Sequence, residues 1–326
     1  MSTPTPKPIY IFSHARVSSN LFVRLISQHP QLTIKTYAFD EAFMWGPERL
    51  VCRQTPQLAA ARDSQSEENK AATYQMGFDN TMDFINETQA KGKTPVLKDH
   101  TYFLLDPNVA ADEFQFEAQR PLALRPVIKT QLEKGTYKEN PAAVCPVVLP
   151  PEFLITLNPI FLIRDPIRFV PSYYKVGVDS IGVRIGDADW PVNSSLRATR
   201  LLFDWYRDQG ISPTVIDALD LVHDTDDTMK ALSKKLNIDY EGIITNWSAK
   251  KPEHDSGQGD GWLASLSNST GIDPSFEPKT SDLEEEYGKW VKKWGEEVGQ
   301  GLKRSVEAAQ EDYLYLRQNS ILSGSS

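Results

Sequence analysis

The chain is poor in cysteine, with only Cys52 and Cys145 among 326 residues. The two residues form no CxxC or CxxH spacing, so the sequence does not predict a structural zinc site. A disulfide scaffold is not expected either, although a single bond between the two cysteines stays an open alternative. This cysteine usage is typical of a protein of a reducing compartment, and we expect a cytoplasmic location.

The chain also lacks an excess of positive charge and any long apolar run. Its formal net charge is -9 and its pI is about 5.2. A nucleic-acid binder needs a basic footprint, so we expect no nucleic-acid partner. No apolar run approaches the roughly 20 residues that span a bilayer, so we expect no membrane association. An acidic chain can still hold a local anion site built from a few arginines, lysines and backbone N–H groups.

Glycine is absent before Gly46, so the first loop is not the GxxxxGK[ST] loop of nucleotide hydrolases. Instead, a short apolar strand at 8–12 is followed by the polar segment SHARVSSN and then by a helix from Leu21. Free N–H groups at a helix N-terminus favour an anion. Two interpretations stay open at this stage, because serine and asparagine are also common helix caps.

The order of predicted elements indicates an α/β fold. Strands are expected at 8–12, at 94–100, within 155–166 and at 214–222. Helices are expected at 21–26, 194–209, 226–238 and 282–316, with a break in the last near 295–301. This alternation predicts one domain over 1–326 with a doubly wound, mostly parallel sheet. We expect an insertion or lid at 106–152 and a frayed tail at 318–326.

Chemically capable side chains stand at the ends of the predicted strands, where such sheets bind ligands. Lys98 and His100 are two residues apart, so both lie on one face of their strand. A histidine beside a lysine is held neutral, which suits a general base, although a surface lysine and a half-buried histidine would also fit the pattern. Arg164 ends the third strand, and Asp165 and Pro166 are typical of the first turn of a helix that would carry Ser172.

These three strand ends together resemble the sulfotransferase family, whose donor is 3′-phosphoadenosine 5′-phosphosulfate (PAPS). SHARVSSNLFVRLI (13–26) is similar to the family's 5′-phosphosulfate loop. VLKDH (96–100) is similar to its Lys-x-His strand end, and FLIRDPIRFVPSYY (161–174) to its 3′-phosphate motif. A fainter similarity covers 214–238. The resemblance implies a P-loop NTPase-like sulfotransferase fold, with PAPS as donor, 3′-phosphoadenosine 5′-phosphate (PAP) as product, and no metal.

The resemblance also implies roles for individual residues. Arg16 would hold the 5′ phosphate and the bridging oxygen, and Arg164 with Ser172 would bind the 3′ phosphate. His100 would deprotonate the acceptor hydroxyl, while Lys98 would steady the transferring sulfonate. Further donor-binding positions would be Ser18, Ser19 and Asn20 in the first loop and, as candidates for the end of the 3′-phosphate site, Lys250, Lys251, Ser256 and Gly257.

The acceptor is less defined than the donor. A small-molecule alcohol or phenol fits a pocket lined by aromatic residues, for which the candidates are Tyr37, Phe39, Phe43, Met44, Trp45, Tyr102 and Phe103. Phe22 is a weak candidate for stacking on adenine. Three alternatives stay open: a P-loop kinase or hydrolase, a non-catalytic nucleotide-binding protein, and an enzyme of this fold that uses sulfonation to activate elimination or ring closure. The oligomeric state is not indicated.

Overall fold

The protein is described from a computed structural model, which covers residues 5–51, 53, 55–114, 126–132, 144–248 and 269–323. Its centre is a sheet of five parallel strands in the order β2-β3-β1-β4-β5. The strands are β1 (Ile9–Ser13), β2 (Leu32–Thr36), β3 (Thr94–His100), β4 (Asn158–Ile163) and β5 (Thr214–Asp217). Because every pair is parallel, all five carboxyl ends meet at one edge, as the α/β prediction requires.

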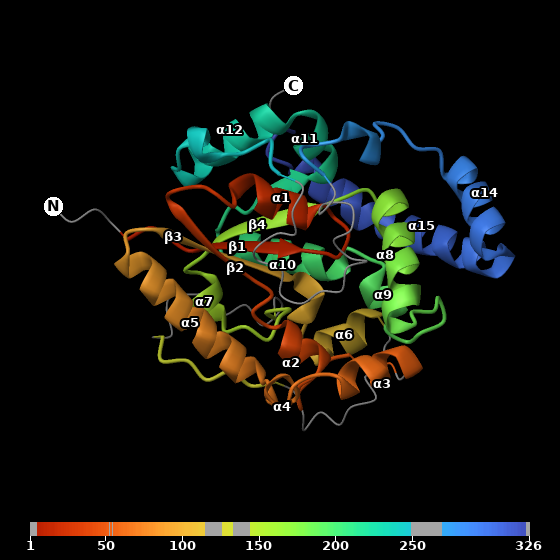
Figure 1. The fold of residues 1–326 in the computed structure, drawn as a ribbon, viewed down its shortest axis with the longest axis horizontal. Coiled ribbons are helices and arrows are strands. Elements are labelled where there is room, and N and C mark those ends of the chain that lie inside the picture. Colours follow the sequence, from red (N-terminus) through yellow and green to blue (C-terminus); the bar gives the residue numbers. More distant parts are fainter. Residues whose placement is uncertain are drawn as a thin grey trace.

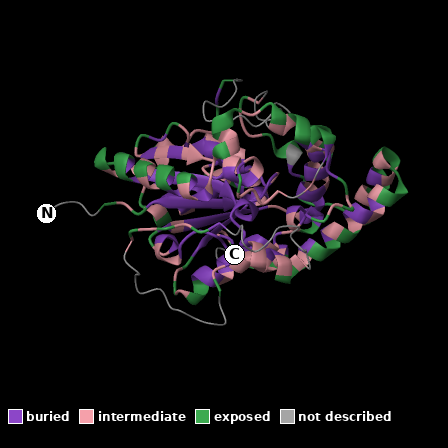
Figure 2. Cartoon of the chain, turned by 90° about the horizontal axis from the view of Figure 1, so that it is seen from below, coloured by how far each residue is buried: buried purple, intermediate pink, exposed green. Residues whose placement is uncertain are grey.

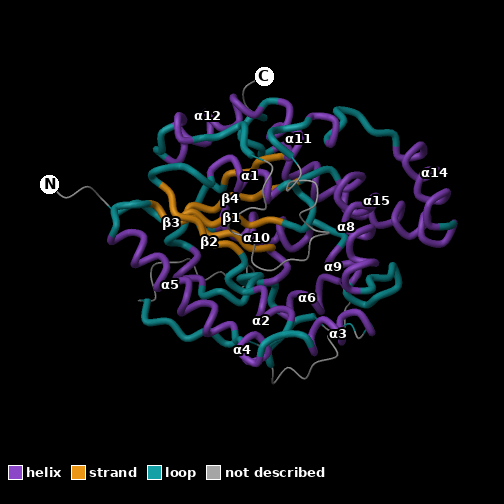
Figure 3. The backbone as a smooth tube through the Cα atoms, in the orientation of Figure 1, coloured by secondary structure: helices purple, strands orange, loops and turns teal. Residues whose placement is uncertain are grey.

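Helices surround the sheet, so that the strands lie in the middle of the molecule (Figures 1 and 3). They are α1 (Ser19–Ile26), α2 (Asp40–Met44), α3 (Pro56–Asp63), α4 (Glu67–Ala71), α5 (Tyr74–Ala90), α6 (Pro107–Phe114) and α7 (Pro151–Leu154) in the first half. The second half contributes α8 (Pro166–Ile181), α9 (Trp190–Asn193), α10 (Arg197–Asp208), α11 (Ala218–His223), α12 (Thr225–Leu236), α14 (Leu283–Trp294) and α15 (Glu296–Gln318).

The sheet is buried on both faces, and the outer faces of the helices carry the exposed residues (Figure 2). Aromatic rings fill the interior beside β1, where Tyr10 stacks on Phe12 with 4.5 Å between ring centroids. Phe12 in turn stacks on Phe161 of β4 at 5.3 Å. Burying such large side chains is the main source of stability in a domain of this size, and it fixes the strand ends relative to one another. No helix within the described residues is long and apolar enough to cross a membrane.

Two local features differ from the sequence-based expectation, and a third agrees with it. The predicted fourth strand at 214–222 ends at Asp217, whose side chain accepts a hydrogen bond from Leu219 N at 2.7 Å and so begins α11. β2 was not predicted, although Leu32 and Ile34 alternate with polar neighbours and both are buried. The break in the C-terminal helix is confirmed, and it lies at Gly295, whose φ of 88° suits glycine.

The two segments singled out as irregular are described only in part. In the expected insertion at 106–152, α6 and an antiparallel bridge between Leu105 and Val147 are described, whereas 115–125 and 133–143 lie outside the described residues. The expected frayed tail differs from the structure as far as residue 323. Ser320 is buried and Ile321 N donates to Val215 O over 2.9 Å, because the end of α15 returns to the edge of the sheet at β5.

Candidate active site

The three strand ends singled out in the sequence belong to neighbouring strands of the sheet. β1 lies between β3 and β4, and the register pairs Ser13 with His100 and Ile11 with Lys98. Direct contacts then join the segments that follow the strands. Lys98 Nζ lies 3.3 Å from Asn20 Oδ1, and Arg164 Nη1 donates to the Arg16 carbonyl over 2.9 Å. The side chains that the sequence placed at the ends of three strands therefore lie close together.

The loop after β1 has a strained backbone. Arg16 and Ser18 have φ values of 70° and 62°, in the left-handed region that costs a non-glycine residue about 1–3 kcal/mol. Ser18 precedes α1, but its side chain makes no capping hydrogen bond, so the helix-cap interpretation has no support for this residue. The backbone N–H groups of residues 17–20 donate to none of the described residues. The loop thus leaves backbone donors available next to the helix N-terminus, as an anion site needs.

Arg16 reaches across to the helix that follows β4. Its Nε atom donates to Ser172 Oγ over 2.9 Å. Burial and the neighbouring charge of Arg164 lower the pKa of Arg16 to about 10. Asp165 begins α8 as expected, since its carboxylate accepts from Ile167 N at 3.0 Å. The guanidinium groups of Arg16 and Arg164 are thus two like charges close together. An anion bound between them would stabilise this arrangement.

A carboxylate that the sequence did not indicate lies against Arg164. Glu277 Oε2 is 2.6 Å from Arg164 Nη2, and the Glu277 side chain is only 4% exposed. Glu277 precedes α14 and its own carbonyl accepts from His223 Nε2 at 2.6 Å. No motif marks it, because a single glutamate 113 positions beyond Arg164 has no local signal.

Lys98 is fully buried although it is a lysine. Its Nζ atom lies 3.5 Å from the centre of the Tyr37 ring and contacts the amide oxygen of Asn20, which also accepts from Tyr37 Oη at 3.3 Å. Burial lowers the pKa of Lys98 to about 7, although the nearby carboxyls of Asp99 and Asp40 oppose that shift. Among the described residues no ion pair forms with Lys98, so its charge is solvated only by an amide and a ring. A bound anion would supply the missing counter-charge.

His100 is held by Ser13, the last residue of β1. Ser13 Oγ lies 3.1 Å from Asp99 O, which can only accept, and 2.9 Å from His100 Nδ1. A hydroxyl has one proton, and we assign it to the Asp99 carbonyl, so that His100 donates from Nδ1–H to Ser13 Oγ. This tautomer leaves the lone pair on Nε2. Burial, and then the charge of Lys98, keeps the pKa of His100 well below its usual value, so the ring stays neutral at pH 7.

His100 also borders a cavity of about 370 Å³. Five of the seven aromatic or apolar residues expected at an acceptor pocket line it, namely Phe43, Met44, Trp45, Tyr102 and Phe103. The other two differ from the expectation, because Tyr37 packs under Lys98 and Phe39 stacks on Tyr74 in the core. The volume is that of a site for a small molecule. The cavity also has polar lining residues that the sequence did not indicate, among them Asp40, Glu41, Arg53, Asp189 and Asn193.

The remaining sequence-predicted residues differ in where they lie. Phe22 is fully buried in the core on α1, so it has no exposed face to stack on a base. Ser19 is buried and Ser18 half-buried at the start of α1, next to Arg16. Four candidates lie outside the described residues, namely Lys250, Lys251, Ser256 and Gly257.

Comparison with known proteins gives two relatives that match nearly the whole chain. Both are named sulfotransferase ppzF. The protein of Metarhizium rileyi is 28% identical over 347 residues, which is 98% of each chain, and that of Metarhizium majus is 28% identical over 349 residues, which is 98% of this chain and 99% of the relative. No family model matches the chain.

Two further matches are shorter or weaker. The branched-chain-amino-acid aminotransferase-like protein 1 of Arabidopsis thaliana is 29% identical over 139 residues, which is 41% of this chain and 23% of that protein. Among solved structures, the sulfotransferase domain from the Synechococcus PCC 7002 olefin synthase aligns with 94% of this chain and 96% of that one, with a TM-score of 0.43 and 14% identity.

Proposed function

The chain is a divergent member of the sulfotransferase family, and from this premise we propose that it transfers the sulfonate group of PAPS to a hydroxyl of a small molecule. One observation carries the choice of PAPS: the loop after β1 is tied through Arg16 to Ser172 and Arg164, and through Asn20 to Lys98. PAPS has two separate anionic ends, a 5′-phosphosulfate and a 3′ phosphate. The cluster offers cationic and donor groups for both.

In this proposal the donor lies along the carboxyl ends of β1 and β4. The 5′ phosphate and the sulfonate lie in the loop after β1, against the backbone N–H groups of 17–20 and the side chains of Ser18, Ser19 and Asn20. The 3′ phosphate lies against Arg164 and Ser172. Arg16 lies between the two ends, which suits contact with the 5′ phosphate and the bridging oxygen. Charge-assisted hydrogen bonds of this kind are among the strongest available to a protein.

His100 is the proposed general base. The acceptor oxygen attacks the sulfur of PAPS as its proton passes to His100 Nε2, and the bond from sulfur to the bridging oxygen breaks, with the electron pair leaving on PAP. The tautomer inferred from the Ser13 hydrogen bond leaves the accepting lone pair on Nε2, the other ring nitrogen. A neutral imidazole that borders a cavity next to the donor loop supports this role.

Lys98 is proposed to stabilise charge on the sulfonate during transfer. It lies two residues before His100 and on the same face of β3, and its Nζ atom is tied to the donor loop through Asn20. Sulfonate transfer resembles phosphoryl transfer in needing alignment and charge stabilisation more than covalent help from the protein. The proposed chemistry uses no metal. A cytoplasmic location stays part of the proposal, on the low cysteine content alone.

Turnover with PAPS tests this proposal. We expect the wild-type protein to convert PAPS to PAP in the presence of a panel of phenols and alcohols, and mass spectrometry to find the sulfate retained on the acceptor. An acceptor that loses sulfate as an alkene or ring forms would instead indicate sulfonation as an activating step. Release of phosphate from ATP with magnesium, without any reaction of PAPS, would overturn the proposal.

A further inference from the structure

The cavity beside His100 is lined by a carboxyl group that the proposed reaction does not use. It belongs to Asp40, the half-buried first residue of α2. Its carboxyl oxygens make no hydrogen bond and no ion pair with any described residue. Burial raises the pKa of Asp40 to about 7, so in the empty cavity both its neutral and its charged form are present near pH 7. A ligand that brings a positive charge would favour the carboxylate.

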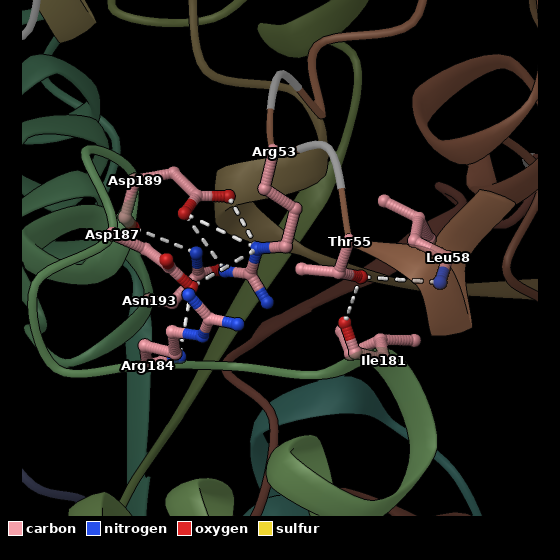
Figure 4. A network of polar contacts seen from close by, with 8 residues as sticks. All are labelled: Arg53, Thr55, Leu58, Ile181, Arg184, Asp187, Asp189 and Asn193. Carbon is pink, nitrogen blue, oxygen red and sulfur yellow. Dashed lines mark hydrogen bonds and ion pairs between the residues drawn. The ribbon is translucent and has the colours of Figure 1, made fainter.

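The cationic side chain of the cavity already has its partners within the protein. Arg53 is the only lysine or arginine among the described residues that line the cavity. Its Nη2 atom lies 2.8 Å from Asp189 Oδ1 and its Nε atom 3.2 Å from Oδ2, and Asp187 adds a second carboxylate with Oδ2 at 3.8 Å from Nε (Figure 4). The phenol oxygen of Tyr173 accepts a further hydrogen bond from the Arg53 side chain. Two carboxylates therefore offset this guanidinium, which leaves no excess positive charge for an anionic acceptor.

The lining of the cavity has an excess of acidic side chains whether or not Asp40 is ionised. Glu41 and Asp189 line it as well, against the single arginine. Lys35 acts on the charge of Glu41, but its Nζ atom donates to Asn80 O over 3.0 Å and it does not line the cavity. A cation is therefore favoured in the cavity over an anion, and an anionic acceptor would also have to keep Asp40 protonated.

Aromatic rings line the cavity close to Asp40 in the chain. Phe43 lies on the same helix and Trp45 directly follows it, and both line the cavity. Phe43 stacks on Phe103 with 4.4 Å between ring centroids, whereas the half-buried ring of Trp45 packs against no ring of the described residues. A cation is attracted to the face of an aromatic ring, most strongly to that of tryptophan. A carboxyl group and an aromatic face from one short segment thus offer the two kinds of contact that bind an ammonium group.

We propose that the acceptor is a phenol that carries a cationic nitrogen on a short side chain, with the ammonium group bound between the Asp40 carboxylate and the ring of Trp45 while the hydroxyl faces His100. The proposal rests on the proposed function. Lys98, whose charge acts on Asp40 from β3, faces the anionic donor in that complex, so the donor offsets its repulsion of the ammonium group. A cavity of about 370 Å³ has room for such a molecule. Asp40 is thereby a specificity-determining residue for the acceptor.

Equilibrium binding to the PAP-saturated protein tests the proposal without requiring turnover. The probes are phenols with a para side chain of several lengths, each ending in an ammonium group, a methyl group of similar size, or a carboxylate. Calorimetry is done at pH 8, where Asp40 is mostly ionised and an alkylammonium, with a pKa of about 10, keeps its charge. In at least one length, we expect the ammonium probe to bind about 10-fold or more tightly than the methyl probe. The carboxylate probe should bind more weakly than the ammonium probe.

Asp40→Asn keeps the shape of the side chain but removes its charge, so the ammonium-to-methyl ratio of affinities should fall several-fold. The control is Asp63→Asn, because Asp63 is exposed on α3 and does not line the cavity, and its ratio should equal that of the wild type. An unchanged ratio in Asp40→Asn, or an equal fall in both variants, would overturn the proposal.

Three results with the wild-type protein would also overturn it, and these need no variant to fold. They are equal binding of the ammonium and methyl probes at every length, preference for the carboxylate, and no binding of any probe. Retained PAP binding in the same samples would leave the proposed function standing, whereas a failure to bind PAP would count against both proposals.

Discussion

The Nε atom of Arg16 donates a hydrogen bond to Ser172 Oγ over 2.9 Å, which links the loop after β1 to the helix after β4. These two residues are 156 positions apart in the chain. The link brings the proposed 5′-phosphate residue within reach of the proposed 3′-phosphate residue. Tertiary contacts thus bring together the residues of the proposed donor site.

Ser172→Ala should weaken PAP binding by about 10- to 100-fold, because a hydrogen bond to a charged group contributes about 1.5–3 kcal/mol. Binding of adenosine 5′-phosphosulfate, which has no 3′ phosphate, should change little. Calorimetry with both nucleotides measures the difference. Ser180→Ala on the same helix is the control, since the exposed Ser180 Oγ donates only to Val176 O. Equal weakening of both nucleotides would show that Ser172 does not contact the 3′ phosphate.

His100→Gln should lower kcat by about 10²–10⁴ if His100 is the general base, while PAP affinity is preserved. Ser13→Ala should lower kcat by a smaller factor. It removes the hydrogen bond that fixes the tautomer of His100, but it leaves the imidazole in place as the base. Single-turnover rates with PAPS and an accepted phenol measure both. In a His100→Gln background, Ser13→Ala should have almost no further effect, since the two residues act together. Additive effects of the two changes would contradict the assigned hydrogen bond.

The dependence of activity on pH should follow the protonation of Lys98 and His100. Because burial brings the pKa of Lys98 to about 7, kcat/KM for PAPS should decline as pH rises through about 7 and the ammonium is lost. Binding of the anionic donor favours the charged form of Lys98 and so raises its pKa. The decline in kcat, which reports the donor complex, should therefore lie at higher pH than the decline in kcat/KM. His100, whose pKa is well below its usual value, should limit activity only at lower pH, where it becomes protonated. Steady-state profiles from pH 5 to 9 measure both limbs.

Lys98→Met separates these contributions. It should reduce the rate and remove the decline near pH 7, leaving only the acidic limb. A decline near pH 7 that persists in Lys98→Met would assign that titration to another group, such as Asp99 or Asp40, whose pKa values are also raised to about 7 by burial.

Glu277→Gln should tighten PAP binding by several-fold. The Glu277 carboxylate lies 2.6 Å from Arg164, in the place where the 3′ phosphate is proposed to bind, so it competes with that phosphate. Without PAP the variant should melt at a lower temperature, because Arg164 then loses its counter-charge in a largely buried site. The gain in Tm on adding PAP should therefore exceed that of the wild type.

Glu286→Gln serves as the matched control, since Glu286 pairs with Arg168 at 3.6 Å on the same side of α8. Its PAP affinity should equal that of the wild type. Weaker PAP binding in Glu277→Gln would mean that the carboxylate positions Arg164 for the phosphate instead of competing with it.

The α/β fold could be predicted because its elements have local signals. The apolar runs of β1, β3 and β4 end at polar residues, and Asp165 with Pro166 marks the start of α8. Parallel pairing then places all the strand ends at one edge, so the cluster around Arg16, Lys98 and Arg164 follows from sequence patterns and topology. β2 was missed because its five residues alternate only weakly, although that alternation was the usable signal.

The polar residues that line the cavity could not be predicted. Arg53 and Asp189 are 136 positions apart, and neither belongs to a motif. Their pairing depends on how the segment around Thr55 packs against the end of α8, which is a property of the tertiary structure. Glu277 could not be predicted either, because it belongs to no motif and its partner Arg164 is distant in the chain. Local patterns and the family resemblance therefore indicated the proposed donor residues, whereas the polar lining of the cavity depends on contacts between distant segments.

Calorimetric binding of PAP, without magnesium, tests the central claim most directly. ATP and the isomer of PAP that carries its phosphate on the 2′ oxygen are the comparison ligands. The account predicts that PAP binds at least about 10-fold more tightly than either, because Arg164 and Ser172 are placed for a 3′ phosphate. Equal binding of ATP and PAP, or no binding of PAP, would contradict PAPS as the donor.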